Sequence, residues 1–225
     1  MRSPTANYTT FFDRRKRRGI DPSFAMNNPI RILRALDSKL DHKIDLIIFG
    51  KAAIVLGFPT APENYGSTQD VDAILPTKNL ETISSDEEFW DALEGTNQDL
   101  KPDGLYMTHL FQEEQIILSP DWSDKTILLE LGLNHIQVSR PSTLDLILTK
   151  MMRGDKYDLE EIGFLIESDH IAPEELEAAF KTARVPDENE ILDLFQRAQP
   201  LVLEIAEKLV GREGFAVTES AATGP

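Results

Sequence analysis

The sequence predicts an α+β protein, with a mixed β-sheet and flanking helices over residues 27–140 and a helical unit over residues 141–211. Three observations predict this class. The 225 residues are 41% hydrophobic, which is enough to build a core. Short apolar runs follow one another at spacings too short for a helical crossover each time, so part of the sheet is expected to be antiparallel. After Arg140 and Pro141 the apolar residues keep only a helical spacing.

Residues 1–26 are polar and basic and are expected to form a flexible arm. Five cations lie together at 14–18, and this cluster suits contact with RNA, DNA or an acidic face of the protein itself. A solvated basic arm is the alternative, because such clusters are common in proteins.

The first ordered element is predicted to be an amphipathic helix that begins at Asn28. Asn28 suits the N-cap and Pro29 suits the first helical position. Ile32, Leu36 and Leu40 follow at a spacing of four residues, which places them on one apolar face.

Two apolar strands are expected next, at 44–49 and 70–75. The first stops at Gly50, and a short helix over 51–56 follows it. Residues 58–69 are rich in turn formers and predict a loop between this helix and the second strand.

The segment Ser85-Asp-Glu-Glu88 has the spacing of a capping box and predicts the start of another helix. Further strands are predicted at 105–111, 115–118, 127–131 and 135–138.

The helical unit is expected to contain four helices with apolar stripes, and the last helix is expected to kink at Pro200. The stripes fall within 144–151, 159–166, 173–183 and 191–209. Residues 212–225 are predicted to be a disordered tail, since small and polar residues predominate there.

Composition excludes several classes of function. The chain has 39 acidic against 23 basic residues, a net charge of −16, so a broad nucleic-acid-binding surface is excluded. The absence of cysteine removes disulfides, thiolate metal sites and cysteine nucleophiles. No apolar run approaches the ~20 residues of a membrane helix. We therefore expect a cytoplasmic protein that makes no contact with a membrane.

Asp70 and Asp72 are the strongest functional candidates in the sequence. They are two residues apart on a predicted strand, so both carboxylates point to the same face. Two anions on an otherwise apolar strand repel each other unless a cation lies between them, and a divalent metal supplies that cation. Mg²⁺ binds through one or two carboxylates together with substrate phosphates, so the pair suits phosphoryl or nucleotidyl transfer. A solvent-facing pair at the start of a strand is the alternative.

The order strand, Gly50, short helix, turn-rich loop and Asp-x-Asp strand resembles the signature of the nucleotidyltransferase fold. That fold is shared by the DNA polymerase β-like and minimal nucleotidyltransferase families. The later run with Lys150, Arg153, Asp158 and Glu161 also resembles the helical part of the type IV toxin (AbiEii-like) and related uncharacterised nucleotidyltransferases.

The resemblance implies a role for each matching residue. Asp70 and Asp72 would hold Mg²⁺ or Mn²⁺, which bridges the phosphates of an NTP. Gly50 would let the backbone approach the triphosphate, and a hydroxyl of Ser67 or Thr68 could donate to a phosphate oxygen.

Three cations are further candidates for nucleotide binding. Lys51 stands where those families have a second Gly or Ser, and it suits either a phosphate contact or a plain surface position. Lys150 and Arg153 could reach phosphates or form salt bridges with Asp158 or Glu161.

The third carboxylate of such sites has no clear position in this sequence. Glu113 and Glu114 are the best candidates because they interrupt an apolar strand pattern. Strand alternation would place them on opposite faces, and Glu114 is preferred.

Two functions follow as hypotheses. The first is a metal-dependent nucleotidyltransferase that moves an NMP from an NTP to a hydroxyl of a protein or RNA acceptor, with a toxin–antitoxin or defence setting implied by the resemblance. The second is a nucleotidyltransferase-like protein without turnover, which acts as a regulator or as an antitoxin-type binding partner.

Overall fold

The computed structural model describes residues 27–221, without the side chains of 108–109 and 212–221. The predicted basic arm at 1–26, with its cluster at 14–18, lies outside the described residues.

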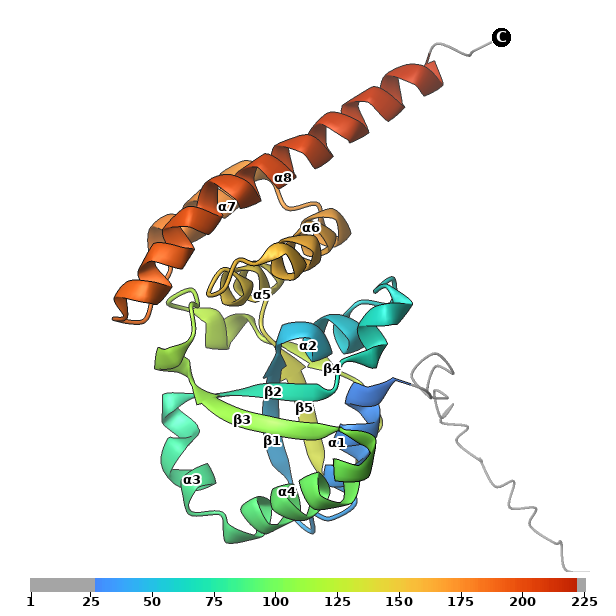
Figure 1. Ribbon diagram of the computed structural model, residues 1–225, viewed down its shortest axis with the longest axis vertical. Coiled ribbons are helices and arrows are strands. Elements are labelled where there is room, and N and C mark those ends of the chain that lie inside the picture. The colour runs from blue at the N-terminus through green and yellow to red at the C-terminus, as the bar shows by residue number, and fades with distance from the viewer. Residues whose placement is uncertain (1–26, 222–225) are drawn as a thin grey trace, which may run out of the picture.

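One mixed five-stranded sheet forms the centre of the N-terminal unit, in the order β3-β2-β1-β5-β4 (Figure 1). Its strands are β1 (Ile44–Phe49), β2 (Asp70–Leu75), β3 (Tyr106–Gln112), β4 (Ile127–Leu129) and β5 (Ile136–Arg140). β1 is antiparallel to β2 and parallel to β5, while β2 is parallel to β3 and β4 is antiparallel to β5. The predicted mixed sheet is confirmed.

Four helices accompany the sheet: α1 (Asn28–Asp37), α2 (Gly50–Gly57), α3 (Leu80–Ser84) and α4 (Glu87–Leu100). α4 packs against α1 and β3, and α2 packs against β1 and β2. Figure 1 shows α1 and α4 at the end of the sheet opposite the C-terminal helices, with α2 on the side towards them.

Two predicted helix caps are wrong by one residue. The side chain of Asn27, and not that of Asn28, accepts from the backbone N–H of Ile30. In the same way Asp86 replaces Ser85, because its carboxylate accepts from the N–H of Phe89 at 2.9 Å. Neighbouring Asx and Ser residues compete for the cap, and a side chain caps only where its backbone is extended enough to reach back.

The predicted strand at 115–118 is also wrong. A 3-10 turn, Glu113–Gln115, follows β3 at once, and its start is closed by reciprocal bonds between Gln112 and Gln115. Leu118 then makes only an isolated bridge with Arg184. A three-residue 3-10 turn interrupts the alternation of apolar and polar residues on which the strand prediction depended.

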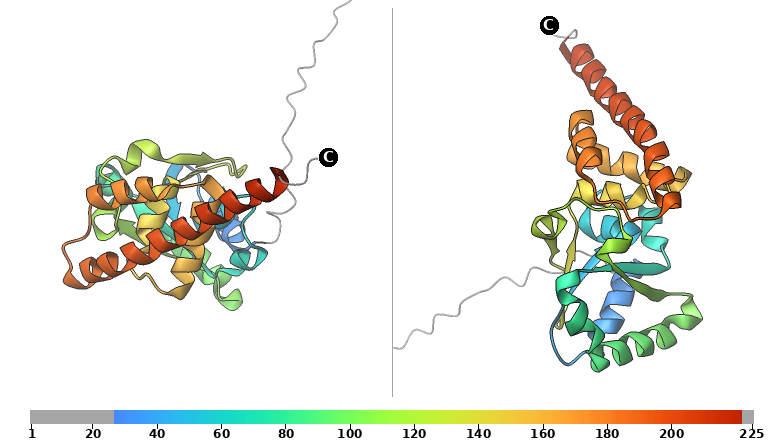
Figure 2. Two further views of the ribbon diagram at one scale, coloured as in Figure 1. Left: turned by 90° about the horizontal axis from the view of Figure 1, so that it is seen from above. Right: turned by 90° about the vertical axis from the view of Figure 1, so that its left-hand side faces the viewer.

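Four helices complete the chain: α5 (Thr143–Lys150), α6 (Lys156–Asp169), α7 (Pro173–Thr182) and α8 (Asn189–Ala221). α5 packs against α2, α6 packs against both α5 and α8, and α7 packs against α8. Figure 2 shows α8 crossing above the sheet as one long rod. It continues through Pro200 to Ala221, so its last turns enter the 212–225 segment predicted to be a disordered tail.

The sheet and the C-terminal helices share one hydrophobic core, because Ile48 of β1, Leu146 of α5 and Ile162 of α6 belong to the same buried cluster and are each fully inaccessible. A shared core holds the two units in a defined relative position. No described helix is long and apolar enough to cross a membrane.

Candidate functional site

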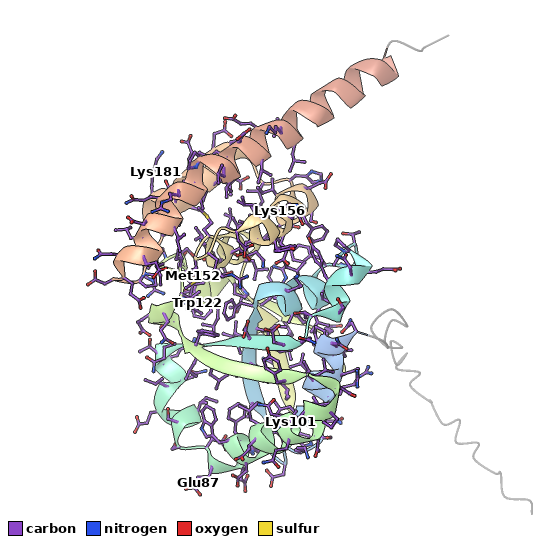
Figure 3. All side chains as sticks on the ribbon, viewed as in Figure 1. Glu87, Lys101, Trp122, Met152, Lys156 and Lys181 are labelled. Atoms are coloured by element: carbon purple, nitrogen blue, oxygen red, sulfur yellow. The ribbon has the colours of Figure 1, made fainter. Side chains whose placement is uncertain are left out.

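A cavity of about 450 Å³ lies between β1 and β2 on one side and α5 and α6 on the other. Both units contribute to its lining, and we call it the sheet–helix cavity. Its volume is within the range of small-molecule sites, roughly 300–1,000 Å³. In Figure 3, Met152 and Lys156 lie on the helical side of the sheet, while Glu87 and Lys101 mark α4 at the opposite end of the molecule.

Asp70 and Asp72 both line this cavity, as the spacing predicted. They occupy the first and third positions of β2, and Val71 between them is fully buried on the other face. Thr68 lines the cavity as well, and its hydroxyl donates to Asp70 Oδ1 at 2.9 Å. This hydrogen bond orients one carboxylate oxygen of Asp70.

Gly50 stands next to this pair at the start of α2. β1 and β2 pair so that Phe49 is opposite Asp72, which brings the end of β1 beside the acidic pair. Gly50 has φ +65°, and a Cβ built on it would lie 3.8 Å from Asp72 Oδ2. A positive φ favours glycine over any L-residue with a side chain, so the backbone approaches the carboxylate here without a Cβ between them.

The N-terminus of α2 faces the same cavity through Gly50 and Lys51. Phe49 occupies the N-cap position and offers no side-chain hydrogen bond to the first turn. The N–H groups of a first helical turn have no partner within the helix, and together with the helix dipole they attract anions. The arrangement suits a phosphate chain beside Gly50.

A chain of ion pairs forms the opposite wall. Lys51 Nζ lies 2.8 Å from Glu161 Oε1, which links α2 to α6. The other carboxylate oxygen of Glu161 accepts a short hydrogen bond from Lys150 Nζ. Lys150 Nζ is also 3.7 Å from Asp158 Oδ1. Arg153 completes the chain with a bidentate contact to Asp158, at 3.0 and 2.9 Å.

Burial differs along this chain. Lys150, Asp158 and Glu161 are buried, with side chains exposed by 5% or less, whereas Lys51 and Arg153 reach solvent. The hydrogen bond with Asp158 raises the pKa of Arg153 above its usual value, so the guanidinium stays charged. Lys150 and Arg153 therefore form the salt bridges that were the alternative for them, and because both also line the cavity, their contact with phosphates stays a prediction.

The charges of the described lining leave a net deficit of cations. Three cationic side chains and five carboxylates line the cavity, a formal charge of −2: Lys51, Lys150 and Arg153 against Asp70, Asp72, Asp155, Asp158 and Glu161. All three cations are already engaged with Asp158 or Glu161. Carboxylate oxygens on one strand face are the donor set that a hard divalent cation prefers, and one such ion balances the deficit. The residues fit a metal at Asp70 and Asp72.

Ser67 is not at this cavity. Its hydroxyl donates to Asn64 O at 2.6 Å, and it lines a different cavity beside Pro62 and Phe58. Of the two hydroxyl candidates, Thr68 is the one beside the acidic pair.

Glu113 and Glu114 also lie outside the sheet–helix cavity. They occupy the 3-10 turn after β3, so they do not alternate on a strand, and both accept hydrogen bonds from Thr77 Oγ1. Glu113 further accepts from Trp122 Nε1 at 2.5 Å and from Arg184 at 3.3 Å.

This environment lowers the pKa of Glu113. Burial raises the pKa of this carboxyl, but the hydrogen bonds from Thr77, Trp122 and Arg184 outweigh burial. The contacts of Glu113 join the turns that follow β2 and β3 to the 3-10 turn Trp122–Lys125 and to the α7–α8 connection, which is a structural role.

Three acidic residues of the cavity, Asp155, Asp158 and Glu161, and the tyrosine Tyr157 had no predicted role in catalysis or binding. Asp158 and Glu161 were predicted as salt-bridge partners and belong to the AbiEii-like run, whereas nothing was predicted for Asp155 or Tyr157. The helical spacing that puts Tyr157 and Glu161 on one side of α6, at i and i+4, is readable from the sequence. The pairing of that side with β2 is not, because it depends on the tertiary fold.

A second acidic group lies away from the cavity. Ligand atoms of Asp41, His42 and Glu88 fall within 4.8 Å of one another. His42 Nε2 also lies 2.8 Å from Asp86, the residue that caps α4. Asp41 and Glu88 are exposed, so we interpret the group as the solvated end of a helix.

Comparison with known proteins gives one family. Residues 30–196 match the model of a family described as nucleotidyltransferase of unknown function (DUF6036), which covers more than half of the chain. No curated protein and no solved structure matches the chain.

Proposed function

The chain belongs to this nucleotidyltransferase family, and from that premise we propose that it transfers a nucleoside monophosphate from an NTP to a hydroxyl of a protein or RNA acceptor. The proposal includes Mg²⁺ or Mn²⁺ as the cofactor. It also includes a toxin–antitoxin or defence setting, in line with the resemblance of the Lys150–Arg153 segment to type IV toxins.

The observation that carries the proposal is the meeting of Asp70, Asp72 and Gly50 at one cavity. An acidic pair that suits a divalent cation stands beside a helix N-terminus that suits phosphate. A metal-bound triphosphate carries a divalent cation and phosphate oxygens together. A single ligand of this kind can therefore occupy the acidic pair and the N-terminus of α2 at once.

The residues of the chain then have distinct tasks. Asp70 and Asp72 would hold the metal, which when bound offsets charge on the phosphates and the leaving pyrophosphate. Gly50 and the first turn of α2 hold phosphate oxygens through backbone N–H groups. Lys51 lies at this turn, and a phosphate would compete with Glu161 for its ammonium group.

The reaction itself balances as a substitution at the α-phosphorus. The acceptor oxygen forms a bond to this phosphorus, and the bond to the bridging oxygen breaks. Pyrophosphate leaves with the electron pair, and the proton of the acceptor hydroxyl passes to a cavity carboxylate.

One observation favours the second function, a nucleotidyltransferase-like binding protein without turnover. β3, the strand next to β2, carries no acidic residue, and Glu113 and Glu114 lie outside the cavity. If the reaction needs a carboxylate from that strand, the cavity binds nucleotide and metal without transferring the NMP.

The test combines binding with transfer. ATP and GTP are titrated into the protein with Mg²⁺, and α-³²P-labelled nucleotide is used to follow transfer to protein and RNA from a cell extract. The variant Asp70→Asn with Asp72→Asn is expected to abolish both binding and labelling. A matched control, Asp45→Asn with Asp91→Asn, changes the same charge at two exposed aspartates and is expected to behave as wild type.

Equal labelling by the wild type and the cavity double variant would refute the proposal. Tight binding by the wild type without labelling of any acceptor would favour the binding protein. Absence of nucleotide binding by the wild type would refute the transferase, and co-purification with a partner protein would then favour the antitoxin-type binding protein.

A further inference from the structure

Tyr157 is the most exposed of the large apolar and aromatic side chains in the described part of the chain, at 70%. It nevertheless lines the sheet–helix cavity, on the first turn of α6. An aromatic side chain this open to water gains little from the fold, since burial of its ring would contribute to stability and exposure does not. Its place at the rim of a charged cavity points to a ligand.

We infer that the ring of Tyr157 is the stacking platform for the nucleobase of the NTP, an inference that rests on the proposed function. A nucleotide has a charged triphosphate and a flat, weakly polar base. The cavity offers the acidic pair with the α2 N-terminus for the first, and Tyr157 for the second.

The backbone under Tyr157 is held firmly. Asp155 caps α6, with Oδ1 accepting from the N–H of Asp158 at 2.9 Å. Asp158 is in turn bound by Arg153 in a bidentate contact. Because the helix start is fixed on both sides, only the side-chain torsions of Tyr157 have to be ordered when a base arrives, and the backbone does not.

The position of Tyr157 relative to the phosphate end follows from the ion pairs. Lys51, next to Gly50, contacts Glu161 at 2.8 Å. Tyr157 precedes Glu161 by four residues, about one helical turn or ~6 Å along α6, and lies on the same side of that helix. The ring therefore stands one turn beyond the contact that joins α6 to the proposed phosphate site.

The other aromatic residues of the cavity are placed differently. Phe49 and Phe111 pack edge to face, with ring centroids 5.5 Å apart and an angle of 88° between their planes. Both rings pack against the buried cluster that contains Trp122, so they form the inner, apolar wall of the cavity. Met152 packs on the same cluster (Figure 3). Among the described lining residues, Tyr157 is the aromatic side chain whose ring remains open to solvent.

The same lining predicts weak selectivity for the base. No asparagine or glutamine is found among the described residues of the cavity. Asn and Gln commonly read adenine edges and Arg and Lys commonly read guanine edges, but the three cations of this cavity are engaged with Asp158 or Glu161. Stacking, in contrast, accepts every base because each has a π-face. We expect ATP, GTP, CTP and UTP to bind with similar affinities, with the purines favoured by their larger rings.

The experiment compares ATP with inorganic tripolyphosphate, each titrated by calorimetry with Mg²⁺. Tyr157→Ala is expected to weaken ATP binding about 5- to 150-fold, the range of one base-stacking contact, and to leave tripolyphosphate binding within about twofold. Tyr157→Phe keeps the ring and is expected to bind both ligands as the wild type does. Tyr106→Ala removes an exposed tyrosine outside the cavity, on β3, as a matched control.

Failure of this inference differs from failure of the proposed function. If the wild type binds ATP and tripolyphosphate and Tyr157→Ala binds ATP equally well, the stacking role is overturned and the function stands. Equal losses of both ligands in Tyr157→Ala, or a loss in Tyr157→Phe as large as in Tyr157→Ala, also overturn it. If the wild type binds neither ligand, the proposed function fails and the inference fails with it.

Discussion

Replacement of Glu161 by glutamine tests the ion-pair chain that joins α2, α5 and α6. The Glu161 side chain is only 5% exposed and contacts both Lys150 and Lys51. Glutamine keeps the shape of the side chain and removes its charge. The ammonium group of Lys150, whose side chain is also 5% exposed, then has Asp158 at 3.7 Å as its remaining ion-pair partner. Asp158 is itself shared with Arg153.

The size of the effect follows from these contacts. Breaking a buried ion pair by removal of one partner costs about 3–5 kcal/mol, and the remaining contact with Asp158 compensates Lys150 in part. The Lys51 pair adds less than about 1 kcal/mol, because the Lys51 side chain is 36% exposed. We expect Glu161→Gln to lower the free energy of unfolding by about 2–4 kcal/mol and Tm by ~5–15 °C.

Urea unfolding of four proteins measures this cost. Lys150→Met with Glu161→Met replaces the buried pair by apolar chains of similar size and is expected to recover most of the loss. Glu160→Gln is the matched control on the same helix, since Glu160 pairs with Lys156 at 3.7 Å in an exposed position. It is expected to change stability by less than about 0.5 kcal/mol. A Glu161→Gln protein as stable as the control, or a Met pair as unstable as Glu161→Gln, would refute the reasoning.

Three further predictions concern Glu113, Gly50 and His42. Glu113→Gln is expected to cost about 1–3 kcal/mol in urea unfolding, since the buried indole N–H of Trp122 loses a charged acceptor, and to leave calorimetric ATP binding unchanged; lost binding with intact stability would support Glu113 as a site residue. Gly50→Ala is expected to cost about 1–2 kcal/mol because of its φ of +65° and to weaken ATP binding; unchanged values in both assays would argue against the strained turn. Asp41 and then Asp86 raise the pKa of His42, so its contribution is complete below pH ~6.5 and is lost as pH rises through the folded-state pKa. Unfolding between pH 5 and 9 should show this loss in the wild type and not in His42→Asn; identical profiles would exclude it.

The parts of the fold that were predicted correctly are those with strong local signals. β1 and β2 are apolar runs that end at Gly50 and Pro76, and both strands have the predicted bounds. The caps of α1 and α4 shifted by one residue because adjacent polar residues compete for one position. The strand expected at 115–118 is wrong because a 3-10 turn interrupts the pattern of alternation.

In the candidate site, too, the features with a local sequence signal were predictable and the tertiary contacts were not. Period-two spacing puts Asp70 and Asp72 on one face of a strand, and that inference needs no tertiary information. The contact between Lys51 and Glu161 joins residues far apart in the chain, so no local pattern predicts it. Glu113 was misplaced for the opposite reason, since a local pattern was extended across a turn that the pattern does not reveal.

The most direct test of the central claim is anomalous diffraction from crystals that contain Mn²⁺ and a non-hydrolysable NTP. We expect a manganese peak roughly 2.1 Å from carboxylate oxygens of Asp70 and Asp72, with the triphosphate at Gly50 and the first turn of α2. Nucleotide bound at another cavity, or manganese only at Asp41, His42 and Glu88, would contradict it.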